Sequence, residues 1–410
     1  MPIRGAGGFL ECASMFRTLL LALALLALRP ALAFELATQC PPSFELGADG
    51  RCELRTLYQR YAGTQGHGGV QAALPPMRAS YTPAQIDLGR HLFFDPLLSA
   101  DRQSSCAHCH HPDHGFSDGR ARAAGFGARG AGPQRQGGVT LARRTPSLWN
   151  VGFATSLFWD GRAADLAQQA RGPLFAPNEM GNTEAALERD LNANATYRGW
   201  FAQAFRRPEN APIRSAEVAT ALAAFQSTLV SLNSRYDRYA HGDRQALNDP
   251  ELRGLNVFRG FVARCTQCHT APLFTNHELA VVGMPPAPGL TVDPGAGAFS
   301  TDPALRGAFK VPTLRNVTRS GPFHFHAGQV QGLEKAVGFY NARRGSALPA
   351  GERQVIHWHV HMLAPRLDLA DVKAIVAFLG ALEDESLMPE IPRAVPSGLP
   401  VVATRAGVLP

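Results

Sequence analysis

The chain has 410 residues, 45% of them hydrophobic, and a formal net charge of +7 from 40 basic and 33 acidic side chains. This length is sufficient for two domains of ordinary size. No basic run is interleaved with aromatic residues, so nothing predicts nucleic-acid binding, although a mildly basic surface can attract an acidic partner.

The first 33 residues have the features of an export signal. Arg17 precedes an apolar run over residues 19–28, and the small-residue site Ala31-Leu32-Ala33 follows. With these flanks the run is too short for a membrane span. We therefore predict a signal peptide over residues 1–33, export to a bacterial periplasm and no membrane span in the mature protein.

Residues 34–77 form an N-terminal extension with two cysteines, Cys40 and Cys52. Of the seven cysteines, four belong to the motifs described next and Cys12 leaves with the signal, so these two remain as a pair. In an oxidising compartment we expect them to form a structural disulfide. The alternative is two unrelated thiols.

The pattern Cys-x-x-Cys-His occurs twice. The first copy comprises Cys106, Cys109 and His110, and the second comprises Cys265, Cys268 and His269. Two thiols three positions apart can each form a thioether to one porphyrin edge, and the adjoining imidazole can then bind the iron. A four-Cys zinc site or two thiol redox motifs would not explain the repeated His. The pattern predicts a redox protein with two covalently bound haem c groups.

A weak internal repeat surrounds the two motifs. Gly-Arg-His-Leu-Phe at 89–93 precedes the first, and Gly-Leu-Asn-Val-Phe at 254–258 precedes the second. We predict a mainly α fold with long loops, in which two cytochrome c-like haem domains are related by pseudo-duplication. The domains are expected to span residues 78–245 and 246–385.

Two stretches carry apolar residues every three to four positions, as on one face of a helix. One starts behind a Ser215 cap and the other after Asp368, and each is expected to close its domain. The repeating residues are Val218, Leu222, Phe225, Leu229 and Leu232 in the first stretch, and Val372, Ile375, Val376, Leu379 and Leu382 in the second. Residues 121–138 and 281–300, rich in Gly, Ala and Pro, are predicted loops, and 386–410 a loose tail.

Three further motifs, with the haem motifs, resemble the bacterial dihaem cytochrome c peroxidase and MauG family. They are Phe158-Trp159-Asp160-Gly161-Arg162, Glu179-Met180-Gly181 and Lys310-Val311-Pro312-Thr313-Leu314-Arg315-Asn316. The resemblance runs from about Thr82 to about Leu382 in the family's order. It implies an enzyme, a dihaem peroxidase, with a peroxidatic haem on the first motif and an electron-transfer haem on the second.

The resemblance also implies catalytic residues. Glu179 matches the family's distal acid–base carboxylate, Gln169 and Pro173 match other distal-pocket positions, and Trp159 matches the tryptophan between the two haems. Cleaving a peroxide needs an open iron position and a group that moves a proton, and a carboxyl beside a buried haem should have a raised pKa. Without the motifs, Glu179 would be interpreted as a surface residue and Trp159 as a core aromatic.

The sixth ligand of the second haem divides the family. Cytochrome c peroxidases place a Met fourteen residues after the His of a His-Asp-Gly turn, whereas MauG-like enzymes have Tyr. Here the turn begins at His326, and Tyr340 stands fourteen positions later. A phenolate favours oxidised iron more than a thioether does. A structural buried Tyr, or ligation by Met284 or Met362, is the alternative.

A second departure concerns the first iron. Many cytochrome c peroxidases of the family carry a blocking His between the first haem motif and Phe-Trp-Asp-Gly-Arg, but this chain has no histidine between His114 and His241. His111 and His114 are too close to the proximal motif to reach the opposite haem face. We therefore expect the first iron to be permanently open, without reductive activation.

Two features weaken the resemblance. The family's calcium site uses an Asn directly before a Ser/Thr-Pro pair, but here that position is Arg144, and a guanidinium cannot ligate calcium, so calcium is doubtful. The alternating His357, His359 and His361 have no counterpart in the family. They are either a metal-binding patch or partner contact, or part of a partly buried strand or turn.

Three functions remain. The leading one is a periplasmic dihaem peroxidase that reduces hydrogen peroxide at the first haem, draws electrons through Trp159 and the second haem, and oxidises a protein partner as MauG-like enzymes do. The second is an ordinary cytochrome c peroxidase with a small cytochrome or cupredoxin as donor. The third is a non-enzymatic dihaem electron carrier, which needs a protein ligand over the first iron.

Overall fold

The computed structural model describes residue 1 and residues 35–62, 73–341, 348–362, 364–384 and 386–405. Contacts divide the chain into two units, Met1–Glu35 and Leu36–Pro410. Apart from Met1, the signal peptide predicted over residues 1–33 lies outside the described residues. Within the described part, no helix is long and apolar enough to cross a membrane.

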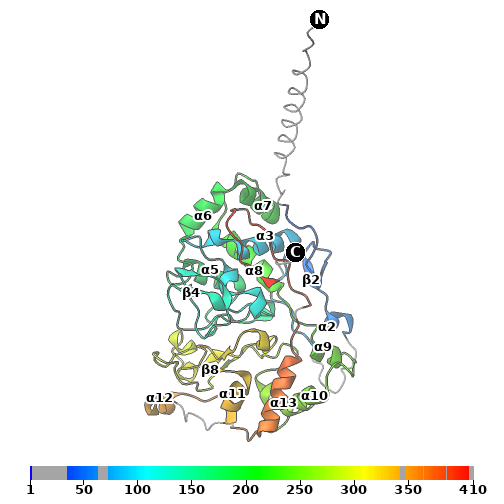
Figure 1. The fold of residues 1–410 in the computed structure, drawn as a ribbon, viewed down its shortest axis with the longest axis vertical. Coiled ribbons are helices and arrows are strands. Elements are labelled where there is room, and N and C mark those ends of the chain that lie inside the picture. Colours follow the sequence, from blue (N-terminus) through cyan, green and yellow to red (C-terminus); the bar gives the residue numbers. More distant parts are fainter. Residues whose placement is uncertain (2–34, 63–72, 342–347, 363, 385, 406–410) are drawn as a thin grey trace. The chain divides into compact units, whose positions relative to one another are not determined.

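The described residues of the second unit are mainly helical with long loops (Figure 1), and they form four short antiparallel strand pairs. The helices are α2 (Leu57–Arg60), α3 (Pro83–Phe94), α4 (Cys106–Cys109), α5 (Leu166–Phe175), α6 (Glu184–Ala193), α7 (Ala195–Phe205), α8 (Ser215–Ser227), α9 (Arg235–Ala240), α10 (Asp249–Arg259), α11 (Leu333–Gly338), α12 (Ala350–Val355) and α13 (Leu369–Gly380). The strand pairs are β1 (Phe44–Leu46) with β2 (Cys52–Leu54), β3 (Ala128–Arg129) with β4 (Gln136–Gly137), β5 (Leu279–Ala280) with β6 (Phe309–Lys310), and β7 (Phe323–His324) with β8 (Val330–Gln331). The prediction of a mainly α fold with long loops is confirmed.

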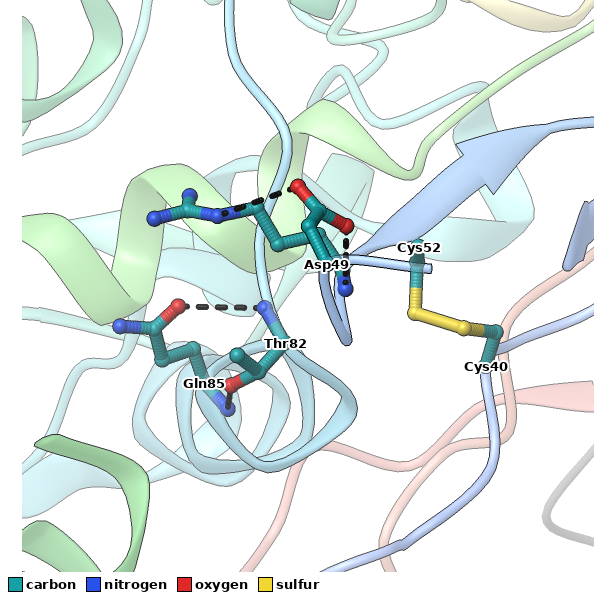
Figure 2. Close-up of a disulfide and its surroundings, with 6 residues drawn as sticks. Cys40, Asp49, Cys52, Thr82 and Gln85 are labelled. Carbon is teal, nitrogen blue, oxygen red and sulfur yellow. Dashed lines mark hydrogen bonds and ion pairs between the residues drawn. A yellow bond between two sulfur atoms is a disulfide. The ribbon is translucent and has the colours of Figure 1, made fainter. Parts of the chain in front are cut away.

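The N-terminal extension is held by the expected disulfide between Cys40 and Cys52, beside the β1–β2 hairpin (Figure 2). The same view shows the start of α3. Thr82 is its N-cap, because the Thr82 hydroxyl accepts from the Gln85 N–H at 3.3 Å while the Gln85 side chain accepts from the Thr82 N–H at 3.1 Å.

The helices α3 and α8 cross so closely that only glycine fits at their contact. A Cβ at Gly89 would lie 1.8 Å from the Ala221 carbonyl oxygen. Around this crossing, Phe93 and Phe225 pack with ring centroids 5.1 Å apart. The helices α5 and α7 complete this first group, α5 against α8 and α7 against α3.

The helices α10 and α13 repeat this arrangement. A Cβ at Gly254 would lie 1.9 Å from the Ala374 carbonyl oxygen, and Phe258 and Phe378 pack with centroids 5.3 Å apart. Helix α11 packs on α13 in this second group. The matched glycines and phenylalanines support our proposal that the two halves arose by duplication, and the boundary between residues 245 and 246 stays a prediction.

The two helices predicted to close the domains are present at the predicted places, but both end earlier than predicted. Helix α13 follows its Asp368 cap as predicted and ends at Gly380. Helix α8 has Arg214 rather than Ser215 at its N-cap, with the Arg214 N–H donating to Glu217, and it ends at Ser227. At this end of α8, the hydroxyls of Ser227 and Thr228 donate to backbone carbonyls of the preceding turn and so compete with further helical hydrogen bonds. Buried side chains beyond each helix end continue the apolar pattern without helical backbone: Leu229, Leu232 and Leu382.

The expectation of a loose tail over residues 386–410 is wrong for its described part. Val395 and Val402 are buried, and the His111 ring lies 3.1 Å from the Ala403 carbonyl through Nε2. The tail therefore packs across the loop that follows the first Cys-x-x-Cys-His motif. Sequence periodicity missed this because irregular chain can bury isolated valines without a repeat.

A buried ion pair ties residues 310–316 to α9. The Arg315 guanidinium donates to both carboxylate oxygens of Asp237, at 2.5 and 2.7 Å, and both side chains are fully buried. The Tyr58 hydroxyl donates to the same carboxylate at 2.6 Å. Burial alone would raise the pKa of Asp237, but the Arg315 charge and these hydrogen bonds lower it overall.

Replacing Arg315 by Met should destabilise the protein by about 3–5 kcal/mol, because the Asp237 charge is left buried without a partner. The matched control is Arg253→Met, which breaks a half-exposed pair with Asp371 at 3.3 Å and should lower the free energy of unfolding by less than about 1 kcal/mol. Urea-induced unfolding at pH 7 measures both. Since the folded-state pKa of Asp237 lies below its unfolded value, the Arg315 contribution should fade as the pH falls through that lowered pKa. Equal losses for the two variants would contradict this assignment.

Candidate functional site

A single cavity of about 990 Å³ receives both Cys-x-x-Cys-His motifs. Every residue that the sequence assigns to catalysis or to haem binding lines it. These residues are Cys106, Cys109, His110, Trp159, Gln169, Pro173, Glu179, Cys265, Cys268, His269 and Tyr340. The fold thus brings residues up to 234 positions apart, from Cys106 to Tyr340, to the lining of one cavity.

The two motif histidines have the same environment. Nδ1 of His110 lies 2.9 Å from the Phe116 carbonyl, and Nδ1 of His269 lies 3.1 Å from the Phe274 carbonyl. An Nδ1–H donated to a carbonyl leaves the Nε2 lone pair free to bind a metal. Burial lowers the pKa of each imidazole to about 4, so both are neutral at pH 7, as iron ligands must be.

The motif cysteines are half-buried, and none of them is joined in a disulfide. Burial raises the pKa of Cys106 and of Cys265 to about 12 and that of Cys109 to about 11. Thiol redox motifs need lowered pKa values, so the environment does not suit them. In the described ranges, no group of three or more His, Cys, Asp or Glu side chains could hold a metal ion, which sets the four-Cys zinc site aside. The residues present fit haem.

Arg135 and Lys310 also line the cavity, and the sequence analysis gave neither of them a role. Arg135 is 1% exposed and donates to the Ala124 carbonyl and the Ser104 hydroxyl, both at 2.7 Å. Burial lowers the pKa of the Lys310 ammonium group to about 8. Positive charge at these points suits the carboxylates that every haem carries. Lys310 stands in one of the quoted motifs, whereas Arg135 lies in a Gly-rich loop that gave no signal.

Hydrogen bonds hold both the indole ring and the backbone of Trp159. Its indole N–H donates to the Arg144 carbonyl at 3.0 Å, and its own carbonyl accepts from the Lys310 N–H at 2.7 Å. The tight turn around it is closed by an N–H···O bond of 2.8 Å from Leu157 to Ala163. The side chain is half-buried and lines the cavity.

Glu179 lies on a loop that folds back on the C-terminal end of α5. The Glu179 N–H donates to the Ala176 carbonyl at 3.0 Å, and the next N–H, of Met180, donates to the Pro173 carbonyl at 3.1 Å. Burial raises the pKa of Glu179, and the Arg162 guanidinium acts in the opposite direction. The half-buried carboxyl therefore does not fit the surface alternative, and its raised pKa is the one expected from desolvation.

Two of the three proposed sixth ligands reach the cavity. Tyr340 stands in a short 3-10 turn, Phe339–Asn341, directly after α11, and both burial and the thiols of the second motif raise its pKa. Met362 also lines the cavity. Met284 does not, and it packs in a separate small hollow beside Gly283. Met284 is therefore set aside as a ligand.

The other histidines that the sequence analysis singled out divide in the same way. His111 and His114 are not among the cavity-lining residues, which agrees with the expectation that they do not block the first iron. His359 and His361 line the cavity with ring centroids 5.2 Å apart, whereas His357 does not line it. Their segment is an irregular turn rather than a strand.

Comparisons with known proteins point to one family. The profile described as di-haem cytochrome c peroxidase matches residues 83–245. The methylamine utilization protein MauG of Methylorubrum extorquens is 36% identical over 322 residues, which cover 77% of this chain and 84% of that protein. The cytochrome c551 peroxidase of Nitrosomonas europaea is 36% identical over 276 residues, covering 66% and 78%.

A solved structure agrees with the sequence relatives. It is a MauG-like protein associated with microbial copper homeostasis, with a TM-score of 0.67 and 29% identity over 77% of this chain and 94% of that one. Together with the cavity that both motifs share, these similarities show that the chain belongs to the dihaem cytochrome c peroxidase and MauG family and is a dihaem peroxidase.

Proposed function

We propose that this protein is a periplasmic peroxidase that reduces hydrogen peroxide at a haem attached to Cys106 and Cys109, and that it thereby oxidises side chains of a partner protein. Cys265 and Cys268 would hold a second haem, which would supply the route by which electrons enter. The observation that carries the proposal is the single cavity lined by both haem motifs together with Glu179, Trp159 and Tyr340.

The overall chemistry is H₂O₂ + 2H⁺ + 2e⁻ → 2H₂O. When bound, the haems supply the iron at which the O–O bond breaks and through which the two electrons pass. Glu179 is suited to take the proton from one peroxide oxygen and return it to the other, since its raised pKa lies closer to neutral pH. Gln169, which lies on α5 and lines the same cavity, offers an amide N–H to the leaving oxygen.

Trp159 is the side chain we assign to electron relay. An indole can lose and regain an electron, which divides one long transfer into two shorter ones. Hydrogen bonds at its N–H and at its backbone carbonyl hold it in one orientation on the cavity wall. Its loss should therefore affect activity more than folding.

Tyr340 supports a protein rather than a small electron carrier as the source of electrons. A phenolate ligand stabilises oxidised iron, so Tyr340 would favour the oxidised form of a haem held by Cys265, Cys268 and His269. The absence of His111 and His114 from the cavity wall supports a first iron that is open without prior reduction.

An ordinary cytochrome c peroxidase is the second candidate, and Met362 is the observation that favours it. This thioether lines the same cavity as Tyr340, and a Met ligand would raise the reduction potential of the second haem. The electron-carrier alternative needs a protein ligand over the first iron, for which Met180, buried beside Glu179, is the candidate.

The first test adds one equivalent of hydrogen peroxide to the diferric protein without reductant and follows the Soret and near-infrared absorption by stopped flow. We expect a rapid and long-lived change, because the first iron is open and Tyr340 stabilises the oxidised second haem. A protein that reacts only after pre-reduction would instead be an ordinary cytochrome c peroxidase. A protein that reacts in neither state would be an electron carrier.

Glu179→Gln should slow the reaction with peroxide by about 10²–10⁴-fold, because the amide cannot move the proton. The control is Glu184→Gln, an exposed glutamate paired with Arg171, which should leave the rate unchanged. In the wild type the basic form of Glu179 is lost as the pH falls through its raised pKa, so the acid limb of the rate should lie above about pH 4.3, the ordinary value for Glu. A normal rate in Glu179→Gln would exclude this role.

The sixth ligand is tested by Tyr340→Phe and Met362→Leu, two substitutions of similar volume. Removing the phenolate should abolish the long-lived spectral change and raise the reduction potential of the second haem by on the order of 100 mV. Met362→Leu should leave both unchanged. Spectroelectrochemical titration measures the potential, and the opposite pattern would assign the ligand to Met362.

A further inference from the structure

Arg144 is a buried cation held by uncharged oxygens. Its guanidinium donates to the Ser320 carbonyl at 2.7 Å, to the Phe323 carbonyl and to the Ser117 hydroxyl at 3.3 Å. The residue is 7% exposed. Its acceptors are two backbone carbonyls and one hydroxyl, and backbone carbonyls are among the oxygens that proteins also offer to calcium.

The Arg144 guanidinium keeps its positive charge in this buried environment. Burial lowers the pKa of the Arg144 guanidinium to about 10, while the nearby Asp118 carboxylate raises it. At pH 7 the group is therefore protonated. An arginine can satisfy several carbonyls at once because its planar fork carries five N–H donors.

The backbone of Arg144 connects two parts of the site. Its N–H donates to the His326 carbonyl at 2.9 Å, and its carbonyl accepts from the Trp159 indole at 3.0 Å. The side chain binds Ser320 and Phe323 in the same loop as His326. Arg144 thus connects Trp159, the proposed electron relay, to the loop that leads into the His326-Ala327-Gly328 turn.

The residues here do not fit the calcium ion of the family. Arg144 stands at the position where the resemblance implies an Asn ligand, and its guanidinium already holds the Ser320 and Phe323 carbonyls. We propose that the Arg144 guanidinium is a built-in cation that replaces this calcium, and that Arg144 is a positioning residue for Trp159. Only the second half of this statement rests on the proposed function, since the replacement of the ion is independent of electron relay.

The wild-type holoprotein gives the first test. After dialysis against EGTA it should contain less than about 0.1 calcium per chain, and its melting temperature and its reaction with peroxide should be the same before and after dialysis. One tightly bound calcium per chain, with a lower melting temperature after its removal, would overturn the proposal. This arm does not depend on any variant folding.

The second test is Arg144→Asn, which restores the family's side-chain oxygen and frees the two carbonyls. In EGTA, this variant should melt several degrees lower, about 3–8 °C, because a buried charge-assisted network is lost. It should also react with peroxide at least tenfold more slowly. Millimolar calcium, but not magnesium, should restore at least half of both losses, because calcium accepts irregular carbonyl ligands and magnesium does not.

A matched control separates this effect from the loss of any arginine. Arg122→Asn removes a guanidinium that donates to one backbone carbonyl, that of Leu141, at 2.7 Å, without touching Trp159. It should show no response to calcium. Recovery of Arg144→Asn by magnesium, no recovery by calcium, or no loss in EGTA would each overturn the proposal. Calcium content and melting temperature are measured without the peroxide reaction, so both results test the replacement of calcium even if the proposed function is wrong.

Discussion

The hydrogen bond between each motif histidine and a phenylalanine carbonyl is the constraint on which the site depends. Phe116 and Phe274 both have positive φ, 54° and 53°, and this conformation turns their carbonyls toward Nδ1 of His110 and His269. The tautomer and the direction of Nε2 follow from that contact, so it would also decide where an iron bound to each histidine lies.

The electrostatics of the cavity are unusual for a protein interior. Arg135, Arg144 and Lys310 bring positive charge to its wall, whereas Glu179 is the carboxyl whose pKa burial raises there. Burying cations is unfavourable unless oxygens accept their hydrogen bonds, and backbone carbonyls accept those of Arg135 and Arg144. Such a wall suits two haems with ionised side chains better than it suits an empty core.

Much of the fold could be predicted from local pattern. The apolar period placed α8 and α13, and the Asp368 cap was correct because an Asn or Asp side chain satisfies free N–H groups at a helix start. Helix ends were not predictable, since the hydroxyls of Ser227 and Thr228 end α8 while buried leucines continue the apolar pattern beyond it. The packed tail was missed for a similar reason, because Val395 and Val402 belong to no period.

The sequence by itself predicted haem chemistry, because covalent haem attachment needs two cysteines and a histidine at a short, fixed spacing that can be recognised without a fold. It also indicated Glu179, Trp159 and Tyr340 through the motifs around them. Only the tertiary structure decided that these residues share one cavity, that Met362 reaches it while Met284 does not, and that Arg144 binds carbonyls. Those facts depend on contacts between residues far apart in the chain, and local spacing carries no information about them.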